Sequence, residues 1–174
     1  FGPRAFRTAL WHLQRMAAEL LGTEDALFVP SGVFGNQCAI GVHTSPGDEV
    51  IVAETTHVID HEAGAAAALS GVQMRTVVPS RATYLTAEDI LPRLRTVADV
   101  HHPDTGLIIV ENALAEGTVM PLAAMREVAD LAREHGVPVH LDGARLFNAA
   151  VALDVPAAEI AAFADSITFC LSKG

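Results

Sequence analysis

The chain contains the stretch Ser166-Ile167-Thr168-Phe169-Cys170-Leu171-Ser172-Lys173-Gly174, an apolar run that closes on a lysine. The branched and aromatic residues of this run predict a buried strand. An amine at the mouth of a buried strand is a candidate nucleophile, because loss of water lowers its pKa and frees the lone pair that attacks a carbonyl. The alternative is a lysine that ends a strand and points into solvent. Lys173 is the only lysine of the chain.

A second stretch, Gly136-Val137-Pro138-Val139-His140-Leu141-Asp142-Gly143-Ala144-Arg145, ends in the same way. Here an aspartate stands where the predicted strand stops. An electron-sink cofactor such as pyridoxal 5'-phosphate needs both groups: a lysine that holds it as a Schiff base, and a carboxylate that keeps its ring nitrogen protonated. Asp142 could instead cap the turn into Ala144, because Asp before Gly is a common turn signal.

Outward from these two stretches, short apolar runs alternate with segments of helical periodicity. Helices are expected at 8–21, from the turn after residue 30 through 40, at 61–69, from 86 toward 97, and at 121–135. Strands are expected at 26–30, 49–53, 72–78, 107–110, 136–142 and 166–173. Strands that are apolar on both faces and alternate with helices predict an α/β fold, a mostly parallel sheet with helices on both faces. Ligands of such sheets bind at the carboxyl ends of the strands.

The composition narrows the class of partner. The formal charge is -10, from 21 acidic against 11 basic residues. This charge disfavours nucleic acid and anionic membrane surfaces, so a small-molecule partner is expected. No apolar segment approaches the roughly 20 residues of a membrane span, and no signal peptide is evident, so we expect a cytoplasmic protein. Cys38 and Cys170 lack CxxC spacing, which predicts free thiols and no metal site.

The two long motifs, His140 to Ala149 and Phe169 to Gly174, resemble those of the low-specificity L-threonine aldolases of the β-eliminating lyase superfamily. The resemblance includes Leu27 to Gly32 and Gly47 to Ile51. It implies the large, cofactor-binding domain of a fold-type I pyridoxal-phosphate enzyme, over residues 1–174 as a single domain. Members of the family continue into a smaller C-terminal domain, so we expect a fragment that lacks this domain and is inactive alone. The resemblance also implies a homodimer or homotetramer.

The family's site residues map onto this chain one by one. Lys173 would hold the cofactor, Asp142 would pair with its ring nitrogen, and Arg145 would bind the substrate carboxylate. The amides of Ser31, Gly32 and Val33 open a helix after a predicted strand and could bind the phosphate. The remaining implied residues are His57, stacked on the cofactor and taking part in proton transfer, Glu62, holding water or relaying a proton, and Asn112, near the phenolic oxygen.

The implied activity is aldol cleavage of L-threonine, L-allo-threonine or related β-hydroxy amino acids to glycine and an aldehyde. Two alternatives stay open: a β-eliminating or β-replacing lyase on the same fold, and a catalytically incompetent truncated aldolase domain. The chain departs from the family at Val33, where threonine is usual, and at Ala113-Leu114, where threonine and histidine are common. The second departure would give the substrate pocket an apolar wall.

Overall fold

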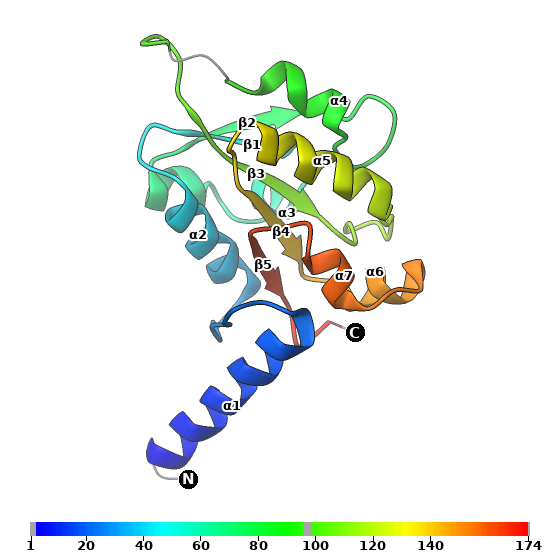
Figure 1. Cartoon of the computed structure of the whole chain (residues 1–174). Helices are drawn as coiled ribbons and strands as arrows, with labels where there is room; N and C mark the ends of the chain where they lie inside the picture. Colours follow the sequence, from blue (N-terminus) through cyan, green and yellow to red (C-terminus); the bar gives the residue numbers. More distant parts are fainter. Residues whose placement is uncertain (1–2, 96–98, 174) are drawn as a thin grey trace.

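Five parallel strands form one sheet at the centre of the molecule (Figure 1). The computed structural model describes residues 3–95 and 99–173. The strand order is β2-β1-β3-β4-β5. The strands are β1 (Glu49–Ala53), β2 (Gln73–Val77), β3 (Thr105–Glu111), β4 (Val139–Gly143) and β5 (Ser166–Phe169). The prediction of a parallel sheet is confirmed.

Helices cover both faces of this sheet (Figure 1). They are α1 (Pro3–Leu21), α2 (Gly32–His43), α3 (His57–Asp60), the π-helical turn η1 (Ala66–Ser70), α4 (Ala87–Ile90), the 3-10 turn η2 (Leu91–Arg93), α5 (Leu122–Glu134), α6 (Leu146–Leu153) and α7 (Ala157–Ala161). The helix α1 extends away from the sheet and contacts α7.

Alternation along the strands divides the apolar core into two layers. On one face, Val50, Val52, Leu107 and Ile109 pack with Ile40 of α2, Val58 of α3 and Ala66 of η1. On the other face, Ile51, Ile108, Val110 and Leu141 pack with Met125 and Val128 of α5 and with α6 and α7. Both faces of the central strands are therefore buried, which is why apolar residues occupy both faces of β1 and β3.

Several predicted boundaries agree with the structure to within a few residues, but the helix predicted at 61–69 is wrong in its first half, because α3 ends at Asp60 and the next helical turn, η1, begins at Ala66. The strand 49–53 is reproduced, and Pro121 lies at the N-cap of α5. Thr86 and Asp89 form the expected capping box. The helix that follows ends as a regular α-helix at Ile90, and the part of its predicted range at residues 96–98 lies outside the described residues.

Two predicted strands need correction. Residues 26–30 have no regular secondary structure, because no neighbouring strand pairs with them in the sheet. The strand β5 ends at Phe169, so that Lys173 lies four positions beyond it. Lys173 is exposed in the structure, and the desolvation that we expected for its amine is not observed.

The helix α2 lies unusually close to β5. A Cβ atom on Gly35 would lie 2.8 Å from Cγ2 and 2.9 Å from Oγ1 of Thr168, which is buried. Glycine thus permits the contact between helix and strand. Gly41 of the same helix differs, because a Cβ there would meet only the Ser70 hydroxyl, at 3.5 Å.

We expect Gly35→Ala to destabilise the protein by about 1–3 kcal/mol, because the added methyl must push α2 away from β5. Gly41→Ala is the matched control, since the same change should stabilise the helix by about 0.5–1 kcal/mol. Denaturant unfolding of both variants measures the difference. Equal stabilities of the two variants would contradict the close packing of α2 on β5.

Among the described residues, no helix is both long enough and apolar enough to cross a bilayer.

Candidate functional site

Three polar residues lie side by side at the carboxyl ends of neighbouring strands. Glu111 of β3 is the register partner of Asp142 of β4, and Asp142 is the partner of Thr168 of β5. All three are buried, on the face covered by α2. The row lies at the edge where parallel sheets bind their ligands.

Asp142 is the centre of this row and is only 3% exposed. Its Oδ2 accepts a hydrogen bond from the side-chain amide of Asn36 at 2.8 Å, and its Oδ1 accepts one from the Ala144 backbone N–H at 3.1 Å. The turn-capping interpretation thus holds for one oxygen. Within the described part of the chain, Asp142 forms no ion pair with an arginine, lysine or histidine. A buried carboxylate without a cation is costly, so a cationic ligand would be favoured beside it.

Glu62 and His57 form a second group above the sheet. The Glu62 side chain is fully buried, and its Oε1 lies 3.0 Å from Nδ1 of His57. The other carboxylate oxygen accepts from Nε2 of Gln37 at 2.7 Å. His57 begins α3 directly after β1, and its backbone N–H donates to Oε2 of Glu111 at 3.2 Å. One third of the His57 side chain is exposed, so its ring is held along one edge and accessible along the other.

Asn36 joins the two groups. Its Nδ2 lies 2.8 Å from Oε1 of Glu62 and 2.8 Å from Oδ2 of Asp142. On its other side, Oδ1 of Asn36 lies 3.2 Å from Nε2 of His140. The sequence analysis did not identify Asn36, Gln37 or His140 as site residues. The sequence did contain a signal for His140. It lies two residues before Asp142 in the same predicted strand, so the side chains of both residues are expected on the same face of the sheet.

The arrangement also bears on metal binding. Ligand atoms of His57, Glu62 and Asp142 lie within 4.8 Å of one another, a spacing that a metal ion could bridge. The Asn36 amide already lies within hydrogen-bonding distance of both carboxylates. An ion would have to displace this amide, so we assign no metal to the cluster.

The N-terminus of α2 offers donors for an anion. Ser31 is the N-cap, and its hydroxyl accepts from the Phe34 N–H at 3.1 Å. The first amides of a helix, here those of Gly32 and Val33, have no acceptor within the helix, and the helix dipole favours a negative charge beside them. A Cβ on Gly32 would meet only Sγ of Cys170, at 3.4 Å. These amides and the carboxylate of Asp142 fit the anionic phosphate and the cationic ring nitrogen of pyridoxal 5'-phosphate.

Two further expected site residues, Arg145 and Asn112, lie at the edge of this arrangement. Arg145 is half-buried at the start of α6, and its guanidinium charge acts on Glu111. The side chain of Asn112 is fully buried and bonds at both ends to the backbone of Met120, at 3.0 Å each. It therefore orders the loop after β3, and no free polar atom of its side chain faces the row. The expected position of Asn112 near the phenolic oxygen of a cofactor stays a prediction.

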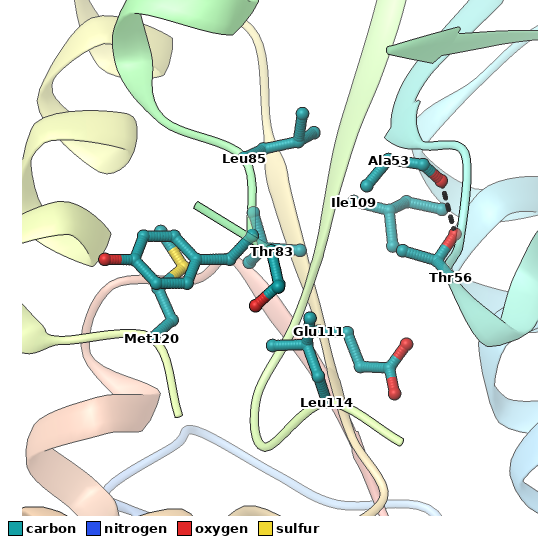
Figure 2. Close-up of a pocket in the computed structure, with 10 residues that line it drawn as sticks. Ala53, Thr56, Thr83, Leu85, Ile109, Glu111, Leu114 and Met120 are labelled. Carbon is teal, nitrogen blue, oxygen red and sulfur yellow. Dashed lines mark hydrogen bonds between the residues drawn. The ribbon is translucent and has the colours of Figure 1, made fainter. Parts of the chain in front are cut away.

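A narrow pocket lies beside Glu111 (Figure 2). Its volume is about 10 Å³, which is enough for one water molecule. Leu114 and Met120 line it, and the Glu111 carboxylate lies away from Met120. Ala113 is buried in the core on the α5 side. The proposed apolar wall for a substrate is thus not formed by Ala113, and it stays a prediction for Leu114.

Glu111 is one of the titrating groups of the site whose pKa is shifted from its ordinary value. Burial raises its pKa above the ordinary value of 4.5, and the neighbouring Asp142 adds to this effect, while the His57 N–H and the charges of His57 and Arg145 oppose it. A raised folded-state pKa means that ionised Glu111 destabilises the fold. The contribution of neutral Glu111 is fully present below pH 4.5 and is lost as the pH rises through the raised pKa.

We therefore expect Glu111→Gln to raise the thermal unfolding midpoint of the cofactor-free protein at neutral pH. The glutamine carbonyl can still accept from the His57 N–H, so the hydrogen bond is kept. The gain should shrink as the pH falls toward 4.5, where glutamate is neutral as well. A gain that is independent of pH would show that burial of the charge is not its cause.

The chain is similar to a known family and to curated proteins of that family. A family model described as beta-eliminating lyase matches residues 7–174. The "Probable low-specificity L-threonine aldolase 2" of Arabidopsis thaliana is 42% identical over 171 residues, which cover 96% of this chain and 48% of that protein. The low specificity L-threonine aldolase of Escherichia coli K12 is 37% identical over 162 residues, which cover 93% of this chain and 48% of that protein. The chain spans about half the length of the curated relatives it matches.

A solved structure gives the same result for the fold. The threonine aldolase of Leishmania major superposes with a TM-score of 0.77 at 30% identity, over 87% of this chain and 45% of that chain. The fold of the chain is therefore shared with a solved threonine aldolase structure over the superposed part.

Proposed function

The chain belongs to the β-eliminating lyase family, and on that premise we propose that it binds pyridoxal 5'-phosphate and serves an aldol cleavage. The substrates are L-threonine, L-allo-threonine or related β-hydroxy amino acids, and the products are glycine and an aldehyde. The relatives named above are aldolases of this kind, with identities of 42% and 37%. The activity is that of the intact protein, of which the chain supplies the cofactor-binding residues.

The observation that carries the proposal is the buried carboxylate of Asp142. It has hydrogen-bond donors at both oxygens but no cationic partner in the described part of the chain. A protonated ring nitrogen beside Oδ2 would supply the missing charge. Asp142 would then keep the proton on that nitrogen through its own negative charge.

The remaining contacts to the cofactor follow from the same edge of the sheet. The amides of Gly32 and Val33 and the hydroxyl of Ser31 would hold its phosphate at the start of α2. Lys173 would hold it covalently, as the only lysine of the chain. When bound, pyridoxal 5'-phosphate supplies an electron sink for the bonds at the substrate Cα.

The chain's own residues account for the proton transfers. In the tautomer that carries its proton on Nδ1, His57 donates to Glu62 at 3.0 Å and keeps Nε2 free as an acceptor. Nε2 can take the proton of the substrate β-hydroxyl as the Cα–Cβ bond breaks and the aldehyde forms. Glu62 stabilises the imidazolium that results. Lys173 or water then returns a proton to Cα and gives glycine, while Arg145 binds the substrate carboxylate.

Assembly and location extend the proposal. Large apolar residues are exposed along α1, among them Trp11 at 56% and Met16 at 67%. Exposed apolar surface of this kind is typical of contacts between subunits, which supports a homodimer or homotetramer. The two cysteines are unpaired, as expected in a reducing compartment, and we place the protein in the cytoplasm.

Product analysis tests the proposed reaction. The intact protein is incubated with L-threonine and with L-allo-threonine, with and without added pyridoxal 5'-phosphate. We expect glycine and acetaldehyde in equal amounts, dependent on the cofactor. Formation of 2-oxobutanoate and ammonia instead would assign the protein to β-elimination, and no product from either substrate would contradict both activities.

A further inference from the structure

A chain of buried and partly buried hydrogen bonds runs from the site to the C-terminal end of α2. It links Asp142 and Glu62 through Asn36 to His140, and continues through Ser166 to His43. The proposed mechanism uses only its first two members. Asn36 and His140 are 1% exposed each, so water does not compete for their hydrogen bonds.

The direction of each bond near the site follows from the groups involved. Ionised carboxylates only accept, so the Asn36 atom at 2.8 Å from both Glu62 and Asp142 must be its NH₂ group. The Asn36 carbonyl oxygen therefore faces His140, at 3.2 Å from Nε2. Because a carbonyl oxygen only accepts, His140 must carry its proton on Nε2. The Thr168 hydroxyl, at 3.5 Å from the same nitrogen, is a weaker contact.

The donors and acceptors at Ser166 and His43 follow from the same reasoning. With its proton on Nε2, neutral His140 accepts at Nδ1, and the donor is the Ser166 hydroxyl at 2.9 Å. That hydroxyl has only one proton, so it must in turn accept from Nε2 of His43, at 2.8 Å. Burial lowers the pKa of His140 to about 4, so it carries one ring proton at neutral pH.

We infer that Asn36 and His140 are positioning residues for the site, in which His140 holds the Asn36 carbonyl so that the Asn36 NH₂ group bridges Asp142 and Glu62. The inference rests on the proposed function, because the expected consequence is a change in how the cofactor is bound. Two buried carboxylates repel each other, and one amide that donates to both offsets this repulsion without a metal. The bridge therefore sets the position of Asp142 toward the cofactor ring and of Glu62 toward His57.

Two amide variants of His140 test whether its hydrogen bond to Asn36 matters, or only its packing. The amide nitrogen of glutamine lies as many bonds from Cβ as the Nε2 of histidine, and the amide nitrogen of asparagine lies as many as Nδ1. His140→Gln can therefore still donate to Asn36, whereas His140→Asn reaches only toward Ser166. Both variants bury the same polar group, so they differ mainly in the bond under test.

The readout is binding of pyridoxal 5'-phosphate to the intact cofactor-free protein, followed by fluorescence, and the visible absorption spectrum of the complex. We expect His140→Gln to bind within about twofold of wild type, and His140→Asn to bind about 10-fold more weakly with an altered visible band. Equal affinities and equal spectra of the two variants would overturn the inference.

Asn36→Asp provides an independent test if the His140 variants do not fold. It keeps the shape of the side chain but removes the NH₂ group, so we expect a loss of affinity at least as large as that of His140→Asn. Wild-type affinity of Asn36→Asp would overturn the inference. Failure of the wild-type protein itself to bind the cofactor would refute the proposed function, which distinguishes the two outcomes.

Discussion

Asp142→Asn is expected to lower turnover of β-hydroxy amino acids by about 100-fold or more while the protein stays folded. The variant keeps the shape of the side chain but removes the charge that holds a proton on the cofactor ring. In the wild type, the Asn36 amide donates to one carboxylate oxygen and the Ala144 N–H donates to the other. Asparagine has only one side-chain oxygen, so the variant also loses one of these two acceptors. Steady-state kinetics with saturating cofactor measures the effect.

Asp165→Asn is the matched control for this change. Asp165 also accepts a backbone N–H, that of Val139 at 2.8 Å, but at the opposite end of β4. We expect near wild-type turnover of this control. If Asp142→Asn also turned over at the wild-type rate, Asp142 would serve only to cap the turn at Ala144.

The second large effect is expected from Lys173→Ala. As the only lysine of the chain, Lys173 is its only primary side-chain amine able to bond covalently to the cofactor aldehyde. Its removal should lower turnover by about a thousandfold or more and abolish the visible colour of the protein. Lys173→Arg is the control for charge, because arginine keeps the cation but lacks the nucleophilic amine, and the same losses are expected. Wild-type colour in either variant would contradict the assignment.

The fold could be predicted from the sequence because its signals are local. The strands 49–53 and 107–110 contain runs of branched apolar residues, at 50–52 and 107–110, that are buried in the structure. The capping box at Thr86 lies within one turn of chain, so it was visible as a pattern. The range 26–30 has equally apolar residues but no partner strand. Whether a segment pairs with another strand depends on the rest of the fold, so five residues alone cannot predict it.

The site was predicted only in part, for the same reason. The structure brings Glu62, His57 and Asp142 together, and the Asn112 side chain bonds to the Met120 backbone in the loop after β3. Asn36 was missed because its role depends on contacts with residues 26 and 106 positions away in the chain. Such contacts follow from the packing of α2 on β4 and β5, and they cannot be predicted from residue spacing in the sequence.

The central claim is that pyridoxal 5'-phosphate is bound through Lys173 at the carboxyl ends of β4 and β5. Reductive trapping tests it directly: the intact protein is incubated with the cofactor, reduced with borohydride, digested, and the modified peptide located by mass spectrometry. We expect a single stable modification, on the peptide that contains Lys173. A modification on another residue, or none in a protein that turns over threonine, would contradict the account.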